Sequence, residues 1–178
     1  MALPLYSGMN QKSKESHSSK NSHEAREKHW RTAQELPQDI FAVWQKPDKA
    51  LNPVSVVATV DPNGIPRTAP FGSLRAITPK LLRIICYRHH TTYTNLQNGF
   101  VSVALVAPPD CAVSVCGRAR IVREHMKTDE QYAVVDIDVE EVKNDMVRTV
   151  SIESAITISP REEYRTWFSE SLGEAESM

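Results

Sequence analysis

Hydrophobic and polar residues alternate along the middle of the chain in short runs that predict β-strands. Residues 53–60, "PVSVVATV", place apolar side chains at every second position. A turn is expected at 61–64, "DPNG", where proline fixes φ at the second position and glycine tolerates the fourth. The two prolines of 65–74, "IPRTAPFGSL", restrict that extended segment to an edge or bulged strand. The run 81–87, "LLRIICY", predicts a strand buried on both faces.

Further runs of the same kind follow at 100–107, 111–124, 131–142 and 148–158. Gly117, in the middle of the second of these, indicates a β-bulge or a close backbone approach. Six or seven short strands with turn signals between them predict a mainly β fold. We therefore expect a six- to seven-stranded antiparallel barrel over about residues 50–158, with short helices added to it.

Helical patterns occur before, between and after these strands. One helix is expected from Ser22 to Glu35, with Ser22 as its N-cap, and a second over 37–45 with a proline at its first position. A short helix starts at Thr91 or Thr92 and ends before Gly99, which suits a C′ position. A last helix follows Ser159, where "SPRE" forms a capping box.

This pattern divides the chain into four parts. Residues 1–22 are largely polar and Ser/Lys-rich, so they predict a mobile tail. Residues 23–48 form an N-terminal helical segment, and 49–172 form the barrel with its C-terminal helix. Residues 173–178 are expected to fray.

Composition narrows the function classes. A formal net charge of −1 offers no argument for nucleic acid or an anionic membrane as a partner. No apolar run approaches the roughly 20 residues that span a bilayer, and the start lacks the features of a signal peptide. Cys86, Cys111 and Cys116 are odd in number without a CxxC pair, so a reducing cytoplasm and buried, inert thiols are expected.

The densest polar chemistry lies in "RHHTTYTNL", residues 88–96. Adjacent histidines point in different directions on a strand or a helix, so they seldom chelate one metal ion, and no metal site is expected. Hydroxyls and free N–H groups at a strand-to-helix junction, with Arg88 beside them, are typical of a phosphate site. An equally good interpretation is that Thr91 or Thr92 only caps the helix. If 65–74 pairs with 81–87, Arg67 lies near this junction.

The ordered series "VSVVATVD", "PNG", "IPRTAPF", "LLRIICY", "HHTTYTNL", "FVSVAL" and "VSVCGRARIV" resembles the FMN-binding split β-barrel superfamily. That superfamily includes pyridoxamine 5′-phosphate oxidase and small FMN-binding proteins, and the resemblance covers about residues 36–158. It implies a split barrel that forms a homodimer, with the flavin sites at the subunit interface. It also implies that Arg67, Thr68, Ala69 and Pro70 line the isoalloxazine ring and ribityl chain. His90, Thr91 and Thr92 would meet the phosphate, with Tyr87 and Arg88 at the strand end.

Two function classes remain open on the sequence. The first is an FMN-dependent oxidoreductase acting on a small molecule, and the second is a flavin-binding electron carrier or sensor without turnover of its own. The deazaflavin F420 in place of FMN is a further alternative within the same fold. The C-terminal RLxP-type signature of true pyridoxamine phosphate oxidases is absent from "PREEYRTWFSESLGEAESM", so vitamin B6 oxidation is not expected. No residue stands out as a catalytic base.

Overall fold

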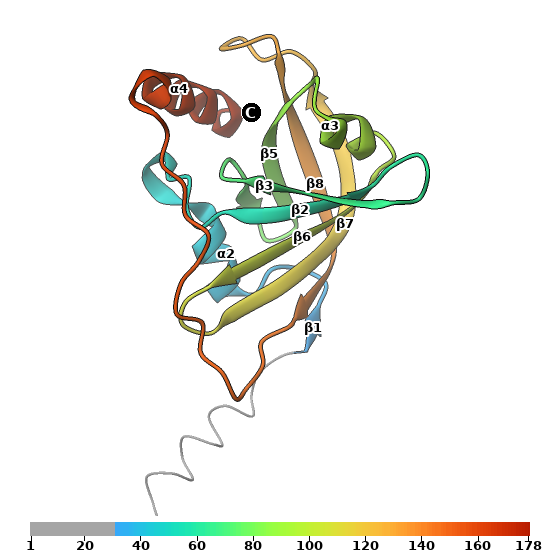
Figure 1. Cartoon of the computed structure of the whole chain (residues 1–178), viewed down its shortest axis with the longest axis vertical. Helices are drawn as coiled ribbons and strands as arrows, with labels where there is room; N and C mark the ends of the chain where they lie inside the picture. The colour runs from blue at the N-terminus through green and yellow to red at the C-terminus, as the bar shows by residue number, and fades with distance from the viewer. Residues whose placement is uncertain (1–30) are drawn as a thin grey trace, which may run out of the picture. The chain divides into compact units, whose positions relative to one another are not determined.

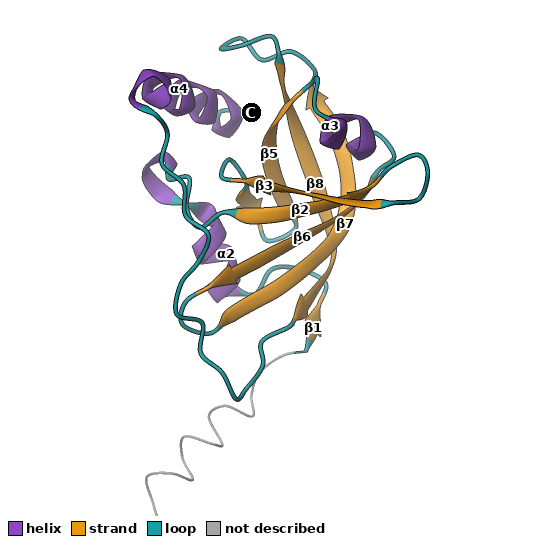
Figure 2. Cartoon of the chain, viewed as in Figure 1, coloured by secondary structure: helices purple, strands orange, loops and turns teal. Residues whose placement is uncertain are grey.

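A computed structural model describes residues 31–178, and the predicted tail 1–22 lies outside them. The described residues form one antiparallel sheet with short helices around it (Figure 1). In sheet order, the strands are β3 (Pro66–Phe71), β2 (Ser55–Val60), β6 (Phe100–Ala107), β7 (Cys111–Arg123), β8 (Tyr132–Asn144), β5 (Leu81–Tyr87) and β4 (Arg75–Thr78), and β1 (Thr32–Ala33) pairs with β8. The helices are α2 (Gln38–Gln45), α3 (Thr91–Leu96) and α4 (Arg165–Glu176), with 3₁₀ turns at Pro47–Lys49 and Glu162–Tyr164 (Figure 2). The predicted mainly β fold is confirmed.

The long strands β7 and β8 run through the middle of the sheet. Their pairing shifts register between Cys116 and Gly117, which is the bulge that the sequence predicts. A Cβ atom at Gly117 would overlap the carbonyl oxygen of Asp138 on β8. Only glycine allows the two backbones to approach this closely.

One buried ion pair ties β5 to β8. The Arg83 guanidinium binds both carboxylate oxygens of Asp136, at 2.6 and 3.0 Å. Arg120 on β7 donates a further bond of 3.0 Å to Asp136, which is only 2% exposed. A carboxylate this deeply buried is tolerated because several donors compensate its lost hydration.

The helix α2 packs against the sheet beside β4. Its Ile40 and Trp44 are buried, and the Trp44 indole N–H donates to the Ser55 hydroxyl on β2 at 2.8 Å. This agrees with the helix expected over 37–45. For the described residues 31–35, the helix expected from Ser22 to Glu35 is wrong, because Thr32 and Ala33 form a strand against the edge of β8. Residues 22–30 lie outside the described part.

The predicted strand at 148–158 is also wrong. Residues 145–161, which we call the strap, run without regular structure from β8 towards α4. Isolated bonds hold the strap: the N–H groups of Asp145 and Ile152 donate to the carbonyls of Ala112 and Pro109, and Val54 N–H donates to the Ile156 carbonyl. Ile158 exchanges two bonds of 2.8 Å with the Asn52 side chain. Its alternating pattern is real, but Val147, Val150, Ile156 and Ile158 are 40–56% exposed instead of facing the core.

The C-terminal helix differs from expectation at both ends. It begins at Arg165, after a 3₁₀ turn, instead of directly after Ser159. It continues to Glu176, so the predicted fraying from residue 173 is wrong. Leu172 and Ala175 are 1% and 2% exposed, and this burial holds the last turns in place.

Candidate functional site

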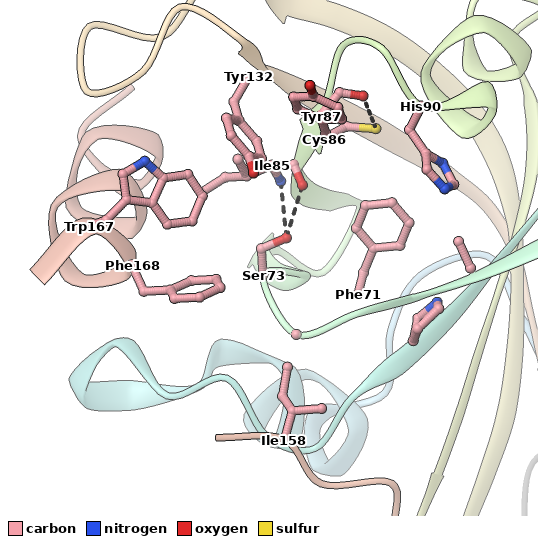
Figure 3. Close-up of a pocket in the computed structure, with 13 residues that line it drawn as sticks. Phe71, Ser73, Ile85, Cys86, Tyr87, His90, Tyr132, Ile158, Trp167 and Phe168 are labelled. Carbon is pink, nitrogen blue, oxygen red and sulfur yellow. Dashed lines mark hydrogen bonds between the residues drawn. The ribbon is translucent and has the colours of Figure 1, made fainter. Parts of the chain in front are cut away.

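A pocket of about 310 Å³ lies between the end of β3, the end of β5 and the helix α4 (Figure 3). This volume is at the lower end of the range of roughly 300–1,000 Å³ for small-molecule sites. Thirteen side chains or glycine backbones line it: Ala69, Pro70, Phe71, Gly72, Ser73, Ile85, Cys86, Tyr87, His90, Tyr132, Ile158, Trp167 and Phe168. None of these thirteen is a lysine, arginine, aspartate or glutamate.

The floor of the pocket is fixed by a hydroxyl. Ser73 accepts the Ile85 N–H and donates to the Ile85 carbonyl, both at 3.2 Å, so it joins the turn after β3 to the middle of β5. Next to it, Gly72 lies so close to the strap that a Cβ atom would stand 2.6 Å from Ile158. The pocket is therefore narrow where β3 ends.

A buried lysine outside the pocket lining supports the turn after β3. The Lys46 ammonium is 2% exposed and donates to the carbonyls of Gly72 at 3.0 Å and Leu51 at 3.3 Å. Burial, with a smaller contribution from the nearby Arg75, lowers the pKa of Lys46 to about 7. The lysine lies outside the pocket lining and acts on it through the Gly72 carbonyl.

Aromatic rings make a continuous wall along one side. Tyr87 at the end of β5 contacts Tyr132 at the start of β8, with ring centroids 5.2 Å apart. Tyr132 contacts Trp167 at 4.7 Å, and Trp167 meets Phe168 edge-on at 4.8 Å. These separations are in the range of favourable aromatic pairs, so the four rings support one another.

The junction before α3 is organised by His90. Its side chain is the N-cap of α3, with Nδ1 accepting the Thr92 N–H at 3.2 Å and lying 2.8 Å from the Thr92 hydroxyl. Thr92 is 3% exposed and is turned into the protein, whereas Thr91 is exposed. The expectation that Thr91 or Thr92 caps the helix is therefore wrong: His90 is the N-cap, and Thr92 is the residue whose N–H it accepts.

The structure brings together four of the nine predicted site residues. Ala69 and Pro70 of β3 line the pocket together with Tyr87 and His90. The other five, Arg67, Thr68, Arg88, Thr91 and Thr92, are not among the lining residues.

Two of the predicted cations are engaged elsewhere. Arg67 forms an ion pair with Asp61 of the hairpin turn at 3.2 Å, with its side chain 57% exposed. Arg88 lies 3.4 Å from Glu124 and donates to the Glu130 carbonyl. The predicted pairing of β3 with β5 is wrong, because β4, which the sequence pattern does not reveal, pairs with β5 instead.

Sequence reasoning missed five of the lining aromatic and polar residues: Phe71, Ser73, Tyr132, Trp167 and Phe168. Trp167 and Phe168 could be recognised only as helix packing residues, because nothing in the sequence says which element α4 covers. Their adjacency gives no further signal, since neighbouring residues on a helix lie about 100° apart and can face the same core.

The thiols and acids offer little further chemistry. Burial raises the pKa of Cys86 to about 12, so the thiol in the pocket is neutral. Cys116 is exposed, contrary to the expectation of buried cysteines.

Within residues 31–178, no group of three or more His, Cys, Asp or Glu residues could hold a metal ion. None of the helices in this range is long and apolar enough to cross a membrane.

Comparison with known proteins places these features in a family context. Residues 48–157, well over half of the chain, match the model of the family described as pyridoxamine 5′-phosphate oxidase. A comparison with curated proteins found no significant match.

Several solved structures share the fold. A protein from Lactobacillus delbrueckii assigned as a pyridoxamine 5′-phosphate oxidase is 22% identical, with a TM-score of 0.53 over 64% of this chain and 98% of that one. HupZ of Group A Streptococcus is 20% identical, with a TM-score of 0.51 over 68% and 99% of the two chains. An F420 reductase is 14% identical, with a TM-score of 0.50 over 62% and 100%. At these identities the likeness concerns the fold alone.

Proposed function

Because the chain belongs to the pyridoxamine 5′-phosphate oxidase family, we propose that it is a flavin-binding protein whose pocket takes the flavin ring. The observation that carries this proposal is the shared lining of one cavity by Ala69 and Pro70 from β3 and by Tyr87 and His90 from the β5–α3 junction. These two segments are far apart in the sequence, and both are implied in flavin binding by the split-barrel resemblance.

The chemistry of the lining fits an isoalloxazine ring. Aromatic and aliphatic side chains make up most of the lining, together with the Ser73 hydroxyl and the His90 imidazole. Since Nδ1 of His90 accepts the Thr92 N–H, the neutral imidazole keeps its proton on Nε2. That N–H can donate to a carbonyl or ring nitrogen of the cofactor.

The phosphate requires donors from outside the lining. Two of the proposed residues, Thr91 and Arg67, are exposed, whereas Thr92 is already bonded to His90. Arg67 would have to exchange Asp61 for the phosphate. An exposed ion pair is worth only about 0–1 kcal/mol, so a dianionic phosphate competes for this guanidinium easily.

When bound, the flavin supplies the electron transfer, and the chain's own residues hold the ring and exclude water from one of its faces. The favoured function is an FMN-dependent oxidoreductase of the reducing cytoplasm that acts on a small molecule. An electron carrier or sensor is the second candidate: none of the thirteen lining residues is a carboxylate or lysine, and His90, the one imidazole among them, already uses Nδ1 to accept the Thr92 N–H. F420 remains an alternative cofactor, since an F420 reductase shares the fold.

We also propose a homodimer with the flavin sites at the subunit interface. A pocket of about 310 Å³ that opens to solvent on one chain leaves much of a flavin mononucleotide uncovered. Among residues 31–178 the sheet also ends at β3, which is mostly exposed and has no strand paired to its outer edge. A second copy would cover both kinds of surface.

The test is to purify the full chain, extract its cofactor and record the absorption spectrum, then titrate the cofactor-free protein with FMN, riboflavin and F420. We expect a flavin spectrum and tighter binding of FMN than of the other two. Failure of all three ligands to bind at micromolar concentration would refute the proposal. Bleaching of the bound flavin by NAD(P)H, followed by reoxidation with turnover, would separate an oxidoreductase from a carrier.

A further inference from the structure

The helix α4 brings two aromatic side chains into the pocket from a segment beyond the family match. That match ends at residue 157, whereas Trp167 and Phe168 belong to α4. Both line the cavity at the end opposite to His90 (Figure 3). This end of the pocket is therefore built by a part of the chain that the family pattern does not describe.

The position of α4 is fixed by a cluster of bonds at its C-terminal half. Glu174 accepts the N–H groups of Lys127 and Thr128 and the Thr128 hydroxyl, each at 2.7 Å. Arg83 donates to the Ala175 carbonyl at 2.8 Å, and Arg75 pairs with Glu176 at 2.8 Å.

Hydrophobic packing adds to these bonds. Leu172 and Ala175 join Leu51, Ile85, Met126 and Val134 in one buried cluster, and Phe168 packs against it. The aromatic end of the pocket is thus held as a wall and not as a mobile lid.

The electrostatic character of this end is neutral. Among residues 31–178, no carboxylate, lysine or arginine lines it, and burial, first among several causes, raises the pKa of the Tyr132 phenol. An anionic group placed here would lose hydration without gaining a cation. A flat apolar ring, in contrast, could pack on the faces and edges of Trp167, Phe168 and Tyr132.

We propose that the α4 end of the pocket selects a neutral, planar aromatic substrate, with Trp167 and Phe168 as its specificity-determining residues. The proposal rests on the proposed function, because the flavin ring is assigned to the β3 and His90 end of the same cavity. It implies that phosphorylated or otherwise anionic aromatic molecules are poor ligands of this end.

The test uses three probes of one carbon skeleton on FMN-saturated protein. They are 2-naphthol, which is neutral and planar, naphthalene-2-sulfonate, which is anionic, and 2-decahydronaphthol, which is neutral and not planar. By isothermal titration calorimetry we expect 2-naphthol to bind at least about ten-fold more tightly than either of the others.

Variants of α4 then assign the selectivity. Trp167→Ala should weaken 2-naphthol by about ten-fold and change the FMN dissociation constant by less than about two-fold. Trp167→Leu and Phe168→Leu keep apolar volume, so a loss of naphthol binding in correctly folded Leu variants reports the aromatic ring itself. Ser169→Ala, an exposed position of the same helix, is the control and should change neither ligand.

Three results would overturn the proposal. If naphthalene-2-sulfonate bound as tightly as 2-naphthol, the pocket would not reject an anionic ligand. If the Trp167 variants bound 2-naphthol as tightly as wild type, α4 would not determine the choice of ligand. Competition of 2-naphthol with FMN, together with weaker FMN binding in Trp167→Ala, would assign this end to the flavin ring itself. If FMN does not bind at all, the proposed function fails by itself, and the probe titrations on flavin-free protein still decide the selectivity.

Discussion

Replacement of Glu174 tests whether α4 is held to the barrel by the bonds described above. Its side chain is 10% exposed, and it accepts three bonds of 2.7 Å besides the ion pair with Arg123. Burial alone would raise the pKa of this carboxyl, but the Thr128 hydroxyl, the two N–H groups and Arg123 outweigh it and lower the pKa to about 2. The ordinary value is 4.5.

The magnitude follows from linkage between protonation and folding. The difference between 4.5 and about 2 corresponds to an upper value of about 3 kcal/mol of stability. Because the folded-state pKa is the lower one, this contribution is fully present above about pH 5 and is lost as the pH falls towards 2. At pH 3 less than half of it remains.

The assay is urea unfolding of wild type and Glu174→Gln, followed by circular dichroism at pH 7 and at pH 3. We expect the variant to be less stable by about 2–3 kcal/mol at pH 7, and the difference to shrink by at least half at pH 3. Glu170→Gln, at an exposed position of α4, is the control. Its free energy of unfolding should lie within about 0.5 kcal/mol of that of wild type at both pH values. A difference that is independent of pH, or a Glu174 variant as stable as the control, would refute this account of how α4 is anchored.

Three further predictions concern the cofactor, the assembly and the sheet. Arg67→Ala should weaken FMN by about ten- to a hundred-fold and riboflavin by little, measured by flavin fluorescence, and equal losses for both would remove Arg67 from the phosphate site. Thr91→Val should cause a smaller loss of FMN than Arg67→Ala, because it removes a hydroxyl and keeps the N–H. Light scattering of the flavin-bound protein should give about twice 20.0 kDa, and a monomer would contradict the interface proposal. Gly117→Ala should cost about 2–4 kcal/mol in urea unfolding, since its Cβ would overlap the Asp138 carbonyl oxygen, whereas an unchanged stability would show that the bulge can relax.

The elements that sequence pattern predicts well are those whose burial follows their own periodicity. The strand β5 is buried on both faces, because Ile85 packs against Leu172 and Ala175 of α4 while the side chains at alternate positions face the other side of the sheet, and its sequence shows this directly. Gly117 is predictable for a similar reason, since a glycine inside a long apolar strand usually marks a bulge or a close approach of two backbones.

The elements that sequence pattern predicts poorly depend on distant partners. Residues 148–158 alternate like a strand, but they make only isolated bonds to other segments, such as Ile152 N–H to the Pro109 carbonyl, and no ladder with another strand. Thr32 and Ala33 become a strand only because β8 extends beyond β5 and offers a free edge there. The length of α4 depends on Glu174 and its partners around Thr128, about 46 residues earlier in the chain, a contact that no local pattern contains.

The candidate site shows the same division. Ala69, Pro70, Tyr87 and His90 are implied by an ordered resemblance and meet in one cavity. Arg67, in contrast, pairs with Asp61 of the hairpin turn. This contact depends on the direction of the Arg67 side chain, which the order of residues in the sequence does not specify.

The strap links α4 covalently to the barrel, so the docking of α4 is an intramolecular binding event. Because the strap is itself bonded to the barrel at Ile152, Ile156 and Ile158, it keeps α4 close to its docking site, at an effective concentration of roughly millimolar or more, so docking needs only modest intrinsic affinity. The cost of closing such a loop grows slowly with its length, by about 0.6 kcal/mol for each doubling. Insertions among strap residues 147–151 should therefore be tolerated, whereas changes at the few anchoring positions of α4 should destabilise the fold. A free peptide of residues 160–178 would have to reach millimolar concentration before it could displace the tethered helix.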